Sequence, residues 1–216
     1  MRTGRPREFC VEEALDSATT VFWRQGYEGA SISDLTAAMG IGAPSLYACF
    51  GNKESLFHAV LDRYDARHKS FIDSVLAATD ARAVAEVFLY GVVDCATDTE
   101  TPGCLLVQSG LSCGNFEIPE MLAKHRSERE AALRERFEQA RKAGDLPKSA
   151  NAAALARYLM VVANGICVQA ASAATAKGLR QVVALSLAGW PAREKCSGET
   201  RAPKKPARSD NHGKNA

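Results

Sequence analysis

The chain has 216 residues, a length that suits one or two domains with a substantial hydrophobic core. Apolar residues make up 46% and charged residues 24%, as in ordinary soluble proteins, and a net charge of +2 gives by itself no argument for nucleic acid. The polar start MRTGRPRE is not the pattern of a signal peptide, so seven cysteines predict mostly free thiols in a reducing cytoplasm.

Residues 1–8 form a basic arm, and the first long helix is expected over 11–25. The arm carries the run Gly4-Arg5-Pro6-Arg7. In the helix, apolar residues at helical spacing share one face, and acidic residues occupy the first turn, where the helix dipole favours them. Gly26 suits the C-cap, whereas the thiol of Cys10 is a poor N-cap acceptor. The apolar face consists of Val11, Leu15, Ala18 and Phe22, and the acidic residues are Glu12 and Glu13.

The segment 31–53 predicts two short helices joined by a tight turn, with a third helix starting at once. Ser31 and Asp34 have the spacing of a capping box, and Gly40 lies where a C-cap needs a left-handed residue. Pro44 suits the first turn of the second helix. The inward positions are Leu35, Ala38 and Met39, then Leu46 and Phe50. Two short helices around a glycine turn, with small residues outside, are typical of a helix-turn-helix that reads the DNA major groove.

Many helix pairs with a glycine turn only pack together, so the generic pattern favours DNA binding weakly. The particular residues are more specific, because they resemble, in order and in register, the DNA-binding head of TetR-type (tetracycline-repressor-like) transcriptional regulators. The resemblance implies an all-α fold, with a three-helix helix-turn-helix head over 9–52 and a larger helical ligand-binding and dimerisation domain over 53–190. The matching residues are Ala18, Phe22, Gly26, Tyr27, Ser31, Ile32, Leu35, Met39, Gly40, Ser45, Leu46, Tyr47, Phe50, Lys53, Leu56 and Phe57.

The resemblance implies phosphate contacts for Ser31, Tyr47 and Lys53, and such contacts fix the register without reading sequence. Base reading falls to the outer residues of the second short helix and its turn, which are Gly42, Ala43, Pro44, Ser45 and Ala48. Many relatives carry a long polar side chain near 42 or 43, and this chain does not. We therefore expect readout through DNA shape, through methyl contacts with thymine, and through Arg5 and Arg7 in an A·T minor groove, with a solvated arm as the alternative.

Beyond the head, helices are expected over 53–78, 81–97, 119–143, 150–176 and 179–190, with a break at Lys177-Gly178 and a short helix within 103–116. Val84, Val87, Phe88 and Val92 are expected on one side of the 81–97 helix. Polar residues interrupt the apolar run 152–175, so no membrane-spanning helix is expected. The basic tail 191–216 is too polar to fold and is expected to be disordered.

Dimerisation follows from geometry, because one recognition helix reads only a few base pairs and two-fold pairing on an inverted repeat extends the site. The last two helices are the candidate interface, and internal packing of the same face is the alternative. The candidate interface residues are Ala156, Leu159, Met160, Ala163, Ile166, Val183, Leu187 and Trp190. The resemblance also implies an apolar effector pocket, for which the candidates are Phe71, Phe88, Gln108, Phe116, Met121, His125 and Asn164.

The expected function is a cytoplasmic, homodimeric repressor that a small-molecule effector releases from its operator. A thiol-based sensor on the same fold is an alternative, because the run around Cys104, with Cys113 shortly after, resembles the reactive-cysteine region of electrophile-sensing members of the family. A small buried hydrophobe is the competing interpretation of Cys104. A helical adaptor without DNA binding is the alternative from a different class.

No enzyme, metal site or cofactor is expected. Cys104 or Cys113 with His125 lacks a third group that would orient a Cys–His pair. The sequence contains no Cys-x-x-Cys pattern, P-loop or Rossmann glycine run.

Overall fold

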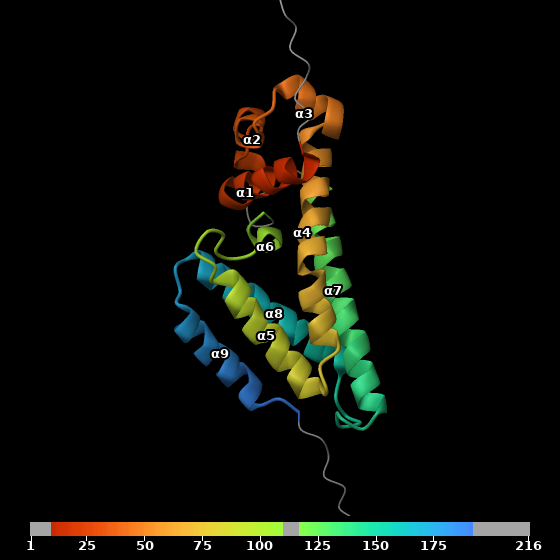
Figure 1. The fold of residues 1–216 in the computed structure, drawn as a ribbon. Helices are drawn as coiled ribbons and strands as arrows, with labels where there is room; N and C mark the ends of the chain where they lie inside the picture. The colour runs from red at the N-terminus through yellow and green to blue at the C-terminus, as the bar shows by residue number, and fades with distance from the viewer. Residues whose placement is uncertain (1–9, 110–116, 192–216) are drawn as a thin grey trace, which may run out of the picture.

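The structure is a computed structural model that describes residues 10–109 and 117–191 (Figure 1). The described residues form helices joined by turns, without a strand, so the expected all-α fold is confirmed. Some sequence expectations fall outside the described residues. They concern the 1–8 arm with Arg5 and Arg7, then Cys113 and Phe116, and the tail from 192 onward.

The head consists of α1 (Val11–Gly29), α2 (Ile32–Met39) and α3 (Ala43–Phe50), packed against the start of α4 (Lys53–Leu76). Its core is aromatic, with the ring centroid of Phe22 lying 4.9 Å from that of Phe57 and 6.1 Å from that of Tyr27. Leu35 of α2 and Leu46 of α3 close this core and are fully buried. Leu35 and Met39 therefore hold α2 to the rest of the head, and Leu46 holds α3.

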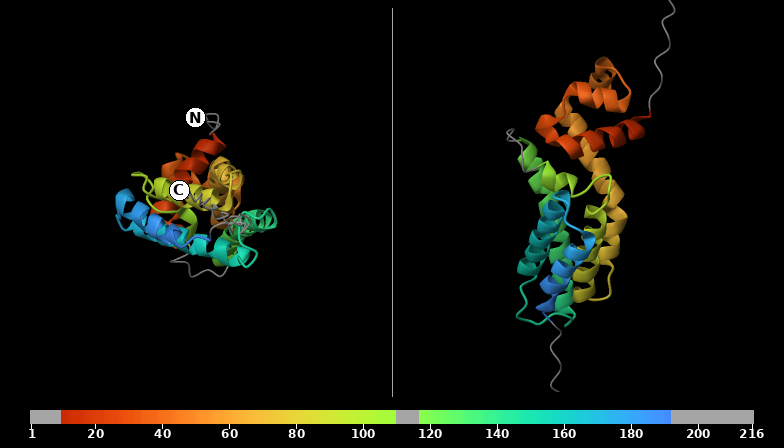
Figure 2. Two further views of the ribbon diagram at one scale, coloured as in Figure 1. Left: turned by 90° about the horizontal axis from the view of Figure 1, so that it is seen from below. Right: turned by 90° about the vertical axis from the view of Figure 1, so that its left-hand side faces the viewer.

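The body consists of α5 (Ala81–Ala96), α6 (Leu105–Gln108), α7 (Glu117–Lys142), α8 (Ala152–Ala171) and α9 (Ala176–Ala188). Helix α4 leaves the head and runs beside α7, while α9 lies at the outer edge of the body (Figures 1 and 2). Among the described helices, α8 alone is long and apolar enough to cross a membrane. Its packing against α5, α7 and α9 accounts for the apolar composition of its inner face.

Several expected boundaries and faces are wrong. The break before the last helix lies at 172–175, because the Thr175 hydroxyl accepts a hydrogen bond from the Gly178 N–H (3.2 Å) and caps α9, which places Lys177-Gly178 inside the first turn. Val87 is 40% exposed, because the buried stripe of α5 follows other positions around the helix. Ala38 is likewise exposed on α2. The short helix within 103–116 is described only over its four residues of α6.

Side chains join the head to the body at two places. The Asp16 carboxylate on α1 accepts a hydrogen bond from Nη2 of Arg63 (2.8 Å) and pairs with Nη2 of Arg67 (2.6 Å), both on α4. Trp23 of α1 donates from Nε1 to the carbonyl oxygen of Pro102 (3.0 Å), in the loop before α6. The head is therefore tied both to α4 and to the loop that carries Cys104.

Candidate nucleic-acid interface and ligand cavity

Local contacts set the turn between α2 and α3. The Ser31 hydroxyl oxygen accepts a hydrogen bond from the Asp34 N–H (3.0 Å), and the Ser31 N–H donates back to the Asp34 carboxylate (3.2 Å), so the predicted capping box is present. A further hydrogen bond from the Ser31 hydroxyl, together with this backbone contact, lowers the pKa of Asp34. Gly40 ends α2 with a φ of 65°, as the sequence predicts.

The outer face of α3 is small and polar rather than cationic. Leu46 anchors the helix inside the head, while Ser45 and Ala48 are exposed and Tyr47 is 48% exposed. The other expected base readers, Gly42, Ala43 and Pro44, form the N-terminal end of the helix. Apart from Tyr47, only small side chains project from this face, so the N-terminal end of the helix can approach a partner closely.

Lys53 opens α4 at the edge of this surface. Its ammonium lies 4.6 Å from the centroid of the Tyr27 ring, a cation–π distance, and 3.5 Å from the carbonyl oxygen of Glu28. Asn52 caps α4 by accepting a hydrogen bond from the Ser55 N–H (2.7 Å). The Lys53 charge is thus positioned by the head itself.

A cavity of about 60 Å³ lies in the body among α4, α5 and α8, beside the loop before α6. Of the residues expected to line an effector pocket, Phe71, Phe88 and Asn164 line it. The two phenyl rings stack with centroids 6.5 Å apart. Gly91 makes room for this stack, because a Cβ there would lie 2.2 Å from the Phe71 ring.

The other described candidates for the pocket do not line this cavity, and local contacts explain why. Gln108 donates from Nε2 to the carbonyl oxygen of Pro102 (2.7 Å). His125 pairs with Asp65 of α4 through Nδ1. Met121 is buried in the core elsewhere on α7. These three residues therefore lie outside this cavity.

The sulfur of Cys104 makes several polar contacts at the cavity. Its Sγ lies 3.3 Å from the Tyr64 hydroxyl, and only 8% of the residue is exposed. The hydrogen bond from the Cys167 thiol, helped by that from Tyr64, lowers the pKa of Cys104 although burial opposes the shift. The same contact and burial raise the pKa of Cys167. Of the two thiols, Cys104 is therefore the one whose thiolate form is favoured.

Sequence reasoning missed Tyr64, Cys167 and Arg129 as groups of this cavity. Tyr64 belongs by helical spacing to the apolar face of α4, and nothing local connects it with α8. The Arg129 guanidinium lies 5.9 Å from the centroid of the Tyr64 ring and pairs with Asp65. Within 10–109 and 117–191, no group of three or more His, Cys, Asp or Glu residues could hold a metal ion.

The residues expected at the dimer interface are buried inside one chain, so that assignment is wrong. Each is at most 8% exposed, because this face packs α8 and α9 against the rest of the body: Ala156, Leu159, Met160, Ala163, Ile166, Val183, Leu187 and Trp190. The opposite faces expose apolar side chains instead, with Val161 at 63%, Val182 at 46% and Leu185 at 77%.

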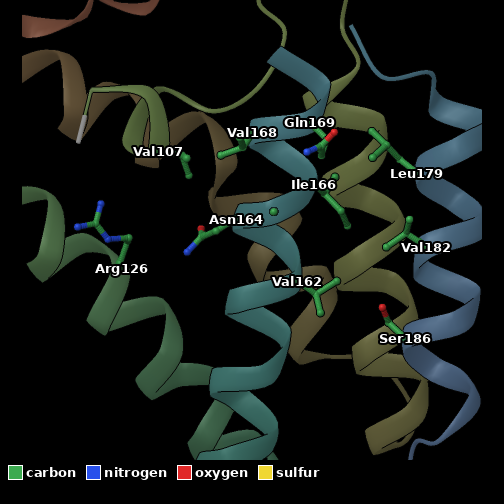
Figure 3. Close-up of a pocket in the computed structure, with 11 residues that line it drawn as sticks. Val107, Arg126, Val162, Asn164, Ile166, Val168, Gln169, Leu179, Val182 and Ser186 are labelled. Carbon is green, nitrogen blue, oxygen red and sulfur yellow. The ribbon is translucent and has the colours of Figure 1, made fainter. Parts of the chain in front are cut away.

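A groove of about 630 Å³ separates the outer parts of α8 and α9 (Figure 3). Val162, Val168 and Val182 line it together with Ser186, and Arg126 of α7 lies at its far side. Most of the groove is formed by α8 and α9, the helices that also carry these exposed apolar residues.

Comparisons with known proteins agree with this geometry. The profile of the bacterial regulatory proteins of the tetR family matches residues 14–60, from α1 into α4. The chain is 34% identical over 194 residues to the HTH-type transcriptional repressor ComR of Escherichia coli (strain K12), across 87% of this chain and 92% of ComR.

Solved structures give the same result. A cysteine mutant of the TetR family transcriptional regulator CifR, complexed with 26bp double-strand operator DNA, superimposes with a TM-score of 0.81 and 39% identity, across 87% of this chain and all of CifR (100%). The reduced form of E. coli NemR has a TM-score of 0.70 at 20% identity, across 81% of this chain and 93% of NemR, and shows the fold alone.

Proposed function

The chain belongs to the TetR family of bacterial regulatory proteins, and we propose that it represses transcription as a homodimer on an inverted-repeat operator. It is a DNA-binding transcriptional regulator, and its relatives are regulators rather than enzymes. A helical adaptor without DNA binding is therefore set aside. We assign it to the cytoplasm, where its operator would lie.

We assign α3 to the major groove. The observation that carries this assignment is the exposed face of Ser45, Tyr47 and Ala48, on a helix that has a proline in its first turn and ends at Gly51. The Tyr47 hydroxyl and the Lys53 ammonium are suited to phosphates on either side of the groove, and Ser31 to a third. The operator complex of CifR, 39% identical to this chain, supports the same docking.

Base reading by this face is restricted by its chemistry. Methyl and methylene groups of Ala43, Pro44 and Ala48 contact thymine methyls, and Ser45 offers one hydroxyl. Specificity therefore depends on groove width and on the arm, for which we keep Arg5 and Arg7 as minor-groove contacts.

The direct test is a band-shift titration with duplexes from the DNA flanking the gene. We expect a specific shift on an inverted repeat, with an affinity that falls as salt rises. Footprinting should protect two half-sites on one face of the duplex. If no flanking duplex competes better than random DNA, operator binding as proposed here is wrong.

The exposed apolar faces of α8 and α9 are the proposed dimer surface. The apolar side chains of Val161, Val182 and Leu185 are exposed to solvent in a single chain. In the proposed dimer, the same faces of a second copy cover them in a two-fold symmetric contact. A dimer that forms through these faces leaves the heads of both protomers free to bind one DNA duplex.

Release from DNA is proposed to start in the cavity. A ligand shifts the repressor only if it binds one state more tightly than the other, and the cavity touches α4, which leads to the head. Its volume of about 60 Å³ leaves room for little more than a very small molecule in this state. A larger effector requires α4 and α5 to separate.

A thiol sensor at Cys104 is the second candidate, and the contact of its sulfur with Tyr64 and Cys167 favours it. Treatment with N-ethylmaleimide should release operator DNA from the native chain and not from Cys104→Ser. Equal release from both proteins would remove this candidate and leave the ligand-controlled repressor.

A further inference from the structure

Cys104 and Cys167 are distant in sequence and adjacent in the body. Both line the cavity, and both are buried, at 8% and 6% exposure. The backbone of the loop before α6 also lies close to α8, because a Cβ on Gly103 would lie only 3.1 Å from the carbonyl oxygen of Cys167. Gly103 also has a φ of 89°, so glycine alone fits the approach of this loop to α8.

We propose that Cys104 and Cys167 form a reversible intrachain disulfide, in which Cys104 attacks a small hydroperoxide and Cys167 resolves the product. The proposal rests on the thiol-sensor candidate and adds two things to it, the class of oxidant and the partner thiol. It also gives Cys167 a chemical role that a buried hydrophobe on an alanine-rich helix would not have.

The surroundings of the two sulfurs differ in a way that assigns their roles. Cys104 receives hydrogen bonds from the Tyr64 hydroxyl and from the Val107 N–H, and the guanidinium of Arg129 favours its negative charge. Arg129 favours a negative charge on Cys167 as well, but the contact with Cys104 and burial outweigh it and raise the pKa of Cys167. Cys104 is therefore the better first nucleophile, and Cys167 resolves the product once it has lost its proton.

The reaction balances with one peroxide. The Cys104 thiolate attacks one peroxide oxygen, the O–O bond breaks, hydroxide leaves, and Cys104 becomes a sulfenic acid. The hydroxide released in this step takes the Cys167 proton and becomes water, the Cys167 thiolate attacks the Cys104 sulfur, the S–O bond breaks, and a second hydroxide leaves. Two electrons pass from the sulfurs to the peroxide, and a dithiol reductant reverses the change.

The size of the cavity suits a small oxidant. About 60 Å³ admits a molecule with a few heavy atoms, such as hydrogen peroxide, beside Phe71 and Phe88.

Closing the bond would reach the head. The sulfurs move from contact to about 2.05 Å apart, so Cys104 shifts toward α8 and away from Tyr64. The Tyr64 ring lies edge-to-face on Trp23 of α1, with centroids 5.5 Å apart, and Trp23 also holds the carbonyl of Pro102. Both contacts of Trp23 with the body are therefore altered together.

The test uses the full-length reduced protein and hydrogen peroxide at about one equivalent, the ratio that the two-electron chemistry sets. Samples are blocked with N-ethylmaleimide, digested and mapped by mass spectrometry. We expect a peptide pair linked through Cys104 and Cys167, which dithiothreitol separates. A link from Cys104 to Cys113, an unlinked Cys104 sulfenic acid, or an unoxidised Cys104 would each overturn the proposal.

Two variants sharpen this result. Cys167→Ala should stop at a Cys104 sulfenic acid that dimedone traps, and its operator affinity under reducing conditions verifies that it folds. Cys95→Ala is the matched control, because Cys95 lines the same cavity and should leave the link intact. A link that survives in Cys167→Ala would contradict the assignment.

Operator binding measured on the same samples separates this proposal from the function it rests on. We expect the oxidised protein to lose at least tenfold in affinity and to regain it with dithiothreitol. A disulfide that forms without changing operator affinity would uphold the dithiol chemistry and remove the thiol sensor. Absence of operator binding in the reduced protein would remove the repressor alone.

Discussion

The head and the body of this protein carry their functional groups in opposite places. In the head, the groups proposed to touch DNA, such as Tyr47 and Lys53, lie on the surface, and caps within a few residues position them. In the body, Tyr64, Cys104 and Cys167 meet in the interior, and three separate segments bring them together. Changes on the head surface should therefore act on affinity directly, whereas changes in the body should act on the response or on assembly.

The largest expected effect concerns the outer face of the body. Val161→Glu places a charge on the proposed dimer surface, where its desolvation opposes association. We expect sedimentation to show a monomer and operator affinity to fall at least about a hundredfold. Val87→Glu is the matched control, because Val87 is also an exposed helical valine but lies on α5. A dimeric Val161→Glu protein would move the interface elsewhere.

Next in size are changes on the head surface. Tyr47→Phe removes one charge-assisted hydrogen bond to phosphate and should cost about tenfold in affinity on every operator variant. Lys53→Ala removes a phosphate contact from each protomer of the dimer and should therefore lower the slope of log affinity against log salt by about two. Lys69→Ala, an exposed lysine farther along α4, serves as the control. An effect confined to some operator sequences would assign these residues to base reading instead.

Trp23→Phe tests the connection between the two regions. The change keeps an aromatic ring against Tyr64 and removes the hydrogen bond to the Pro102 carbonyl. We expect operator affinity to stay within about twofold, because the lost hydrogen bond joins α1 to the loop before α6 and lies away from the proposed DNA surface, while release by peroxide or effector weakens severalfold. Trp190→Phe, in the other tryptophan of the chain, should leave the response intact. An unchanged response in Trp23→Phe would place the coupling in α4 alone.

The smallest effect is a gain in stability at the start of α1. Cys10 occupies the N-cap without a side-chain hydrogen bond to the helix, as expected from its thiol. Cys10→Asp supplies an acceptor for a free N–H and should raise the free energy of unfolding by about 1 kcal/mol. Thermal denaturation measures the gain, and Cys10→Ala, which adds no acceptor, should not show it. A gain shared by both variants would mean that loss of the thiol is responsible.

The helices and turns of the head could be predicted from the sequence, because the residues that determine them are only a few positions apart. The Ser31–Asp34 capping box and the left-handed Gly40 follow from spacings of a few residues. The faces of the body helices were harder, since Val87 and the α8 residues take their burial from helices that approach from elsewhere. The pairing of Cys104 with Cys167 crosses 63 positions of the sequence and has no local signature.

The small outer face of α3 has a consequence for the genome. A reader that senses the width of a groove, more than the identity of each base, accepts families of sequences with a common shape. Promoters controlled by this protein would then share little when aligned letter by letter. A search of the genome by consensus would miss members of the regulon that a search by calculated groove width would recover.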